Sequence, residues 1–102
     1  MAYTTLTTWE LHDETDWDLF MHTIREHRLP ALIRLGAERV TVIRTSDRTA
    51  AAISEWPDQR TRDDAAGMID KVRGKVHSDG SRMTGEMKGL VVADTREMEL
   101  ES

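Results

Sequence analysis

Three tryptophans have the clearest chemical potential in this sequence, because only one phenylalanine and one tyrosine accompany them. An indole provides a flat apolar wall and a single N–H donor, which suits a pocket for a small aromatic molecule. Trp17 lies among apolar residues at helical spacing and is expected in the core. We predict Trp9, Trp56, Thr7 and Phe20 as ligand-binding residues, with core packing as the more common alternative role for the aromatic ones.

A histidine is the candidate for acid–base chemistry. His27 continues the apolar helical stripe of Trp17, Phe20, Met21 and Ile24, so we predict that it points into the space between helix and sheet. A histidine there could take a proton from a bound molecule, and His27 is the predicted catalytic residue. The alternative is a buried histidine with a purely structural role.

Other histidines and acids raise the question of a metal site. His12 lies close to Asp13 and Asp16, and His22 lies one helical turn before Glu26. Two histidines and one carboxylate would suit non-haem iron, but no spacing in the sequence supplies a defined third ligand. We therefore predict no metal and no cofactor.

Two glutamates belong to predicted strands. Glu55 precedes Trp56, so the two side chains point to opposite faces of the sheet. We predict that Glu55 forms a salt bridge with Arg39 or Arg44 at a subunit interface, and we assign Glu86 a similar role. Neither glutamate has a second acid at a spacing that predicts general acid–base catalysis.

Length and composition limit the classes of protein. The 102 residues form one domain, which we place at residues 1–94, followed by a C-terminal tail at 95–102 that is flexible or associated with an interface. The net charge is −5 and the 14 basic residues are scattered, so we predict no nucleic-acid partner. No stretch approaches the ~20 apolar residues of a membrane span. There is no cysteine, and we expect a cytoplasmic protein with no membrane partner.

The elements that must position these residues follow from periodicity and turn signals. A β-branched stretch predicts a strand over 3–11, and Thr15 is expected to cap a helix that Pro30 ends or kinks near Arg28. A short helical turn over 31–35 closes at Gly36. Strands are predicted over 40–45, 49–56 and 89–94, the last of them extended backwards through Met87. Asp58 is expected to cap the helix that precedes this last strand.

The resulting order, β-α-β-β-α-β, predicts a ferredoxin-like α+β fold with a four-stranded antiparallel sheet and both helices on one face. The opposite face should then be polar, but the stretch "AAAISEWPD" over 50–58 places small or apolar residues on both faces of its strand. A single chain of this size has nothing to cover a second face. We therefore expect a homodimer in which two sheets pack face to face.

Three segments of the chain carry a resemblance to a known family. These are "HRLPALIRLGAERVTVIRT" (27–45), "ISEWPD" (53–58) and "MTGEMKGLVVAD" (83–94). Between Asp16 and Asp94 the sequence resembles the dimeric α/β-barrel superfamily, in particular its antibiotic-biosynthesis-monooxygenase-like branch. The resemblance implies the ferredoxin-like fold and the dimer.

The resemblance also implies two kinds of activity. Members include monooxygenases that act without a cofactor on polycyclic aromatic molecules, commonly with an asparagine on the first strand and tryptophans around a pocket, and haem-degrading enzymes with a histidine ligand on the second helix. This chain has no asparagine, and His77 stands about one turn late for such a ligand. Binding or oxidation of a small aromatic or apolar molecule is one expectation. A non-catalytic structural or regulatory dimer without a ligand is the other.

Overall fold

The computed structural model describes residues 2–78 and 80–95, so part of the predicted tail lies outside the described residues. Within α4 the side chains of residues 72 and 74–78 also lie outside the described part of the structure. The side chain of His77 is one of these. The elements in chain order are β1 (Tyr3–Leu11), α1 (Trp17–Thr23), the π-helix η1 (Ile24–Arg28), α2 (Leu29–Arg34), β2 (Arg39–Arg44), β3 (Thr49–Trp56), α3 (Gln59–Asp64), α4 (Ala66–Ser78) and β4 (Ser81–Leu90).

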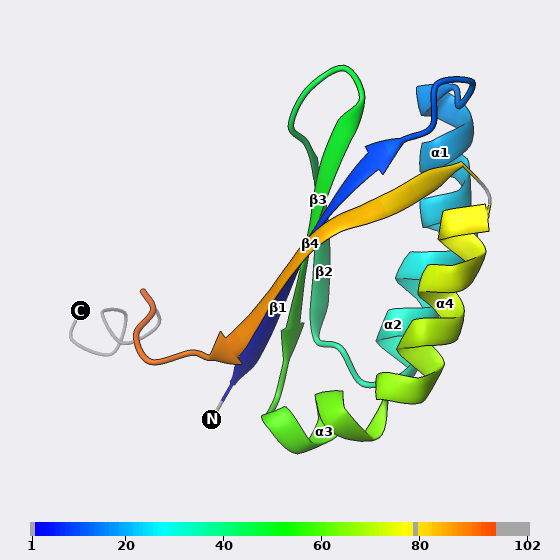
Figure 1. Cartoon of the computed structure of the whole chain (residues 1–102). Helices are drawn as coiled ribbons and strands as arrows, with labels where there is room; N and C mark the ends of the chain where they lie inside the picture. The colour runs from blue at the N-terminus through cyan, green and yellow to red at the C-terminus, as the bar shows by residue number, and fades with distance from the viewer. Residues whose placement is uncertain (1, 79, 96–102) are drawn as a thin grey trace.

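The four strands form one antiparallel sheet in the order β2-β3-β1-β4, which is the predicted ferredoxin-like arrangement. Helices α1, α2 and α4 lie on one side of the sheet, as Figure 1 shows. We call the side of the sheet that faces them the inner face. Side chains alternate along β1, so its odd-numbered residues are buried on the inner face and its even-numbered residues lie on the opposite, outer face.

A π-helical turn interrupts the first helical segment. In η1 the N–H of Leu29 donates to the carbonyl of Ile24, five residues earlier instead of four. Pro30 follows at once. It has no N–H to complete an α-helical bond to the carbonyl of Glu26, and a wider turn before it accommodates that loss. The π turn also changes which side chain reaches the sheet: Arg28 is buried, whereas His27 is exposed.

The inward orientation predicted for His27 is therefore wrong. In an α-helix of 3.6 residues per turn, either His27 or Arg28 could continue the stripe that ends at Ile24. The π turn contains more residues per turn, so the position four residues after Ile24 comes to face the sheet.

Helix starts are partly as predicted. Asp58 caps α3, because its Oδ1 accepts a hydrogen bond of 2.7 Å from the backbone N–H of Thr61. The predicted cap at Thr15 is wrong, since α1 begins after Asp16 and Thr15 Oγ1 instead donates to the carbonyl of Gly80 at 2.7 Å. That bond ties the start of α1 to the start of β4.

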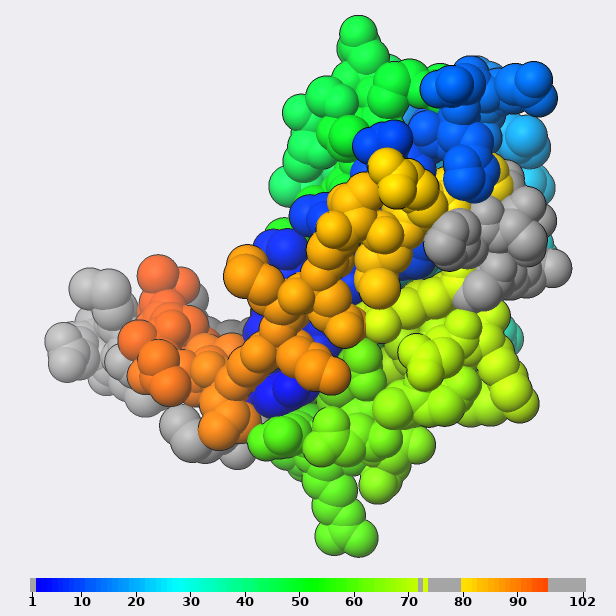
Figure 2. Space-filling model, in the orientation of Figure 1, coloured from blue at the N-terminus to red at the C-terminus, as the bar shows by residue number. Residues whose placement is uncertain are grey.

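The last strand differs from its prediction. β4 covers Ser81–Leu90, whereas the apolar run predicted a strand over 89–94. It is an edge strand that pairs only with β1, with a bulge opposite Thr8 and Trp9, and Figure 2 shows it crossing the front of the molecule. An edge strand exposes much of its surface, so its side chains need not be apolar. The hydrophobic pattern therefore missed residues 81–86 and wrongly placed 91–94 in the strand.

The outer face of the sheet is apolar and uncovered. No helix of the described chain lies over it (Figure 1). At its centre the strand pairing places Leu6 beside Ile53 and Met87. Met87 is 68% exposed and Ile43 is 45% exposed. A groove of about 220 Å³ lies beside Leu6 and Met87 on this side. No described helix is long and apolar enough to cross a membrane.

Candidate functional site

Thr7 is the polar centre of the inner face. It lies near the middle of β1, opposite Ala52 of β3, and its side chain is buried. The Trp9 indole Nε1–H donates to Thr7 Oγ1 at 2.8 Å, and the Arg28 guanidinium donates through Nη2 to the same oxygen at 3.1 Å. A hydroxyl oxygen has two acceptor lone pairs, and both are used here. The hydroxyl hydrogen of Thr7 is left as the remaining donor.

Arg28 is a buried cation. Its side chain comes from η1 and lies against Trp9, with the guanidinium carbon 4.6 Å from the centre of the indole ring. The residue is 4% exposed, and no carboxylate among the described residues forms an ion pair with it. Burial, with a smaller effect from the positive charge of Arg73, lowers the pKa of Arg28 from its ordinary value to about 10. The group therefore remains charged at neutral pH.

Two further arginines enter the same space from the second helical region. Arg62 of α3 and Arg73 of α4 both approach Glu86 of β4, with Nη2–Oε2 distances of 3.8 Å and 2.5 Å respectively. The Nε atoms of both arginines are buried without a hydrogen-bond partner. Partial burial acts to raise the pKa of Glu86, but the hydrogen bond and positive charge of Arg73 hold it below its ordinary value.

The position of Glu86 corrects its prediction. We expected it at a subunit interface, yet its carboxylate pairs with two arginines of the same chain. The bulge between β1 and β4 shifts the register, so Glu86 pairs with Thr7, an inner-face residue. Glu55 is as predicted on the outer face, where Arg39 lies 3.8 Å away.

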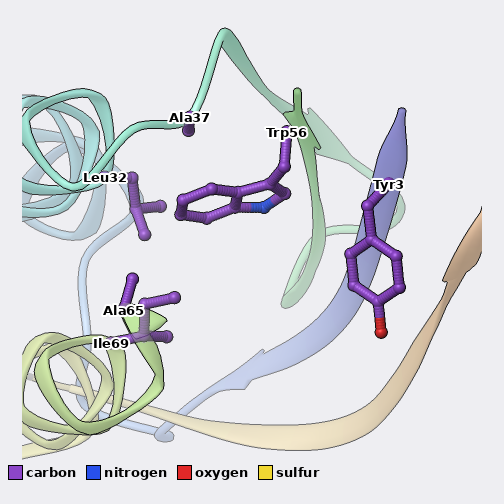
Figure 3. Close-up of a cluster of buried hydrophobic side chains, with 6 residues drawn as sticks. All are labelled: Tyr3, Leu32, Ala37, Trp56, Ala65 and Ile69. Carbon is purple, nitrogen blue, oxygen red and sulfur yellow. The ribbon is translucent and has the colours of Figure 1, made fainter. Parts of the chain in front are cut away.

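Trp56 belongs to a separate hydrophobic cluster at the other end of the inner face. Figure 3 shows its ring reaching from β3 towards the helices, between Leu32 and Ala37 on one side and Ala65 and Ile69 on the other. It is fully buried, and its indole N–H has no hydrogen-bond partner among the described residues. Trp56 is on the predicted face but in a different cluster from Trp9.

Phe20 and Trp9 were both predicted as ligand-binding residues, and both are buried on the inner side. Both lie in a second cluster with Leu11, Ile24 and Ala50. Trp17 is only partly buried at its margin, where Arg44 of β2 stacks on its ring at 4.2 Å.

The structure thus brings together Thr7, Trp9 and Phe20, but not His27. Sequence reasoning missed Arg28, Arg62 and Arg73. A signal for the last two was present, because they extend the buried stripe of Ala65 and Ile69 at helical spacing, where an unpaired charge is rare.

No protein-family model and no curated protein sequence matches the chain. Solved structures do match it. A mutant of SnoaB, a cofactor-independent oxygenase from Streptomyces nogalater, superposes with a TM-score of 0.74 at 15% identity, covering 91% of this chain and 95% of that one. A dimeric ferredoxin-like protein from an uncultured marine organism gives 0.68 at 15% identity, with 91% and 90% covered.

A third structure is that of a candidate antibiotic biosynthesis monooxygenase. This protein from Chloroflexus aurantiacus matches with a TM-score of 0.68 at 7% identity, covering 92% of this chain and 96% of that one. Identities this low establish the fold and nothing finer. The chain therefore has the ferredoxin-like fold of the antibiotic-biosynthesis-monooxygenase-like proteins, as its sequence predicts.

Proposed function

We propose that this protein binds a small aromatic molecule between helices and sheet and oxidises it with molecular oxygen, without a cofactor. The observation that carries the proposal is the convergence of Trp9 and Arg28 on Thr7. An indole supplies a flat wall for an aromatic ring, and the guanidinium and hydroxyl supply donors for a substrate oxygen. The fold shared with a cofactor-independent oxygenase adds support by analogy.

The proposed reaction requires few catalytic groups from the protein. An electron-rich aromatic with an acidic C–H group loses a proton, the carbanion gives its electrons to oxygen, and a hydroperoxide forms. Loss of water leaves a carbonyl, so one oxygen atom enters the product and the other leaves as water. A buried cation such as Arg28 would stabilise the negative charge on the substrate oxygen, and it would act more strongly than in water because the site is desolvated.

A substrate of this class provides a direct test. Anthrone carries one acidic CH₂ group and gives anthraquinone and water with one molecule of oxygen. We expect the protein to accelerate anthraquinone formation, followed by absorbance and by oxygen uptake. In samples that circular dichroism shows to be folded, Thr7→Val should abolish most of the acceleration, whereas Thr5→Val, a buried change on the same face, should not. Equal rates with and without the wild-type protein would contradict oxidation.

A non-catalytic dimer is the second candidate. It is favoured by the complete burial of Trp9 and Trp56 inside two hydrophobic clusters, which is the normal state of a packed core. Native mass spectrometry of freshly purified protein separates the candidates. Extra small-molecule mass that Trp9→Phe removes and Trp17→Phe retains supports ligand binding. A ligand-free species that also fails to bind added anthrone supports the second candidate.

We also propose that two copies pair through the outer face of the sheet. The centre of this face is apolar, and its charged residues pair with one another, as in Arg82–Glu10 and Arg39–Glu55. One chain has a mass of 11.7 kDa, and light scattering should give twice this value. Ile53→Lys, in the middle of the face, should give monomers. Ile33→Lys, on an exposed site of α2, is the matched control. A monomeric wild-type mass at micromolar concentration would contradict the pairing.

A further inference from the structure

The interior between helices and sheet contains more positive than negative charge. Arg28, Arg62 and Arg73 enter it, and Glu86 is the one carboxylate that pairs with any of them among the described residues. Buried ionised groups are normally paired, since an isolated charge loses its hydration without compensation. This arrangement leaves about two positive charges without a counter-ion from the described chain.

The hydrogen bonds of these three arginines show the same shortage of negatively charged partners. Among the described residues, Arg28 donates to the neutral oxygen of Thr7 and forms no ion pair with a carboxylate. The Nε–H groups of Arg62 and Arg73 are buried and have no hydrogen-bond partner among the described residues. Buried donors in folded proteins are almost always hydrogen-bonded, whether to protein, to bound water or to an ion. A small oxyanion would accept from these groups and neutralise their charge together.

We infer that the aromatic substrate is an anion, an aromatic carboxylate whose ring lies against Trp9 and whose carboxylate pairs with Arg28. The inference rests on the proposed binding of an aromatic molecule at this site and specifies its charge. A guanidinium presents paired N–H donors in the plane that matches a carboxylate, which a neutral aromatic would leave unused. Arg73 stands close enough to raise the electrostatic energy of Arg28, and a shared anion would reverse that repulsion.

Solvent reaches this charge at one edge of the sheet. The side chains of Arg73 and Glu86 are 14% and 26% exposed, whereas Arg28 and Arg62 are nearly fully enclosed. A carboxylate arriving between α4 and β4 would therefore meet Arg73 first. It would displace the partly exposed Glu86 carboxylate from its ion pair with Arg73 before it reached Arg28.

The test compares two probes of the same shape, 2-naphthoate and the neutral 2-naphthamide. Their dissociation constants are measured by calorimetry on the wild-type protein. We expect naphthoate to bind more tightly than naphthamide by roughly tenfold or more, because its charged carboxylate forms stronger, charge-assisted hydrogen bonds. Arg28→Gln should remove this preference while both probes still bind. Arg60→Gln, which deletes an exposed charge on α3, should retain it.

The outcomes separate the inference from the function beneath it. If the two probes bind equally to the wild-type protein, the aromatic site stands and its preference for an anion is refuted. If neither probe binds, both proposals fail. If Arg28→Gln does not fold, Arg73→Gln replaces it, and the preference should then fall several-fold. A preference that neither arginine substitution changes would place the anion elsewhere and overturn the inference.

Discussion

Replacing Thr7 by valine should destabilise the protein far more than the loss of one hydroxyl group suggests. Valine keeps the shape and the β-branch, so it fits the strand. However, Trp9 Nε1–H and one Arg28 N–H both lose their acceptor while they remain buried. A buried donor without a partner costs about 1–3 kcal/mol, and more when it is charged, so the sum is about 3–5 kcal/mol. That is a large part of the ~5–15 kcal/mol that stabilises a typical domain.

The matched control is Thr5→Val. Thr5 is also buried on the inner face of β1, two residues away, but no described donor uses its side-chain oxygen. We expect this change to alter stability by less than about 1 kcal/mol. The free energy of unfolding is measured by urea titration at one fixed protein concentration, because association also contributes to stability. If the two variants differ by less than about 1 kcal/mol, Thr7 is not the acceptor for both donors.

Two further changes test the rest of the structure. Glu86 has a folded-state pKa below its ordinary 4.5, so the stability that it contributes is present above that pH and is lost as the pH falls through its folded value. The stability difference between wild type and Glu86→Gln should therefore shrink in acid, and an equal difference at neutral and strongly acidic pH would argue against the ion pairs. Gly80→Ala should destabilise the protein, because φ is 132° and the new Cβ would clash with Thr15, whereas Gly67→Ala meets no atom within 4 Å and should stabilise α4 by about 0.4–1 kcal/mol in thermal melts. If Gly80→Ala proved more stable than Gly67→Ala, this result would contradict the positive φ at Gly80.

The fold was largely predictable because strand alternation and turn chemistry act locally. The range of β3 and the cap at Asp58 follow from sequence alone. Alternation also groups the odd-numbered residues of β1 on one face, but the structure was needed to show that this face meets the helices. β4 was not predictable in the same way. Its pairing with β1 is a long-range contact, and its charged, glycine-containing sequence reflects an exposed edge rather than a buried strand.

The candidate site was predictable only in part. Thr7, Trp9 and Phe20 come together because they lie on faces that period-two and helical patterns identify. Arg28 was missed for two reasons. Hydrophobic patterning assigns an arginine to the surface, and it also assumes an α-helical turn where the chain forms a π turn.

Because Arg28 and not His27 lies on the inner face, the site can perform a different chemistry from the one predicted. An imidazole would gain and lose a proton near neutral pH, whereas the pKa of Arg28 stays near 10 even after burial. A guanidinium that is always charged cannot remove a proton from a substrate. It can lower the pKa of a substrate oxygen beside it, because it favours the anion. Under the proposed function, the protein would therefore stabilise the deprotonated substrate electrostatically and leave the proton to water.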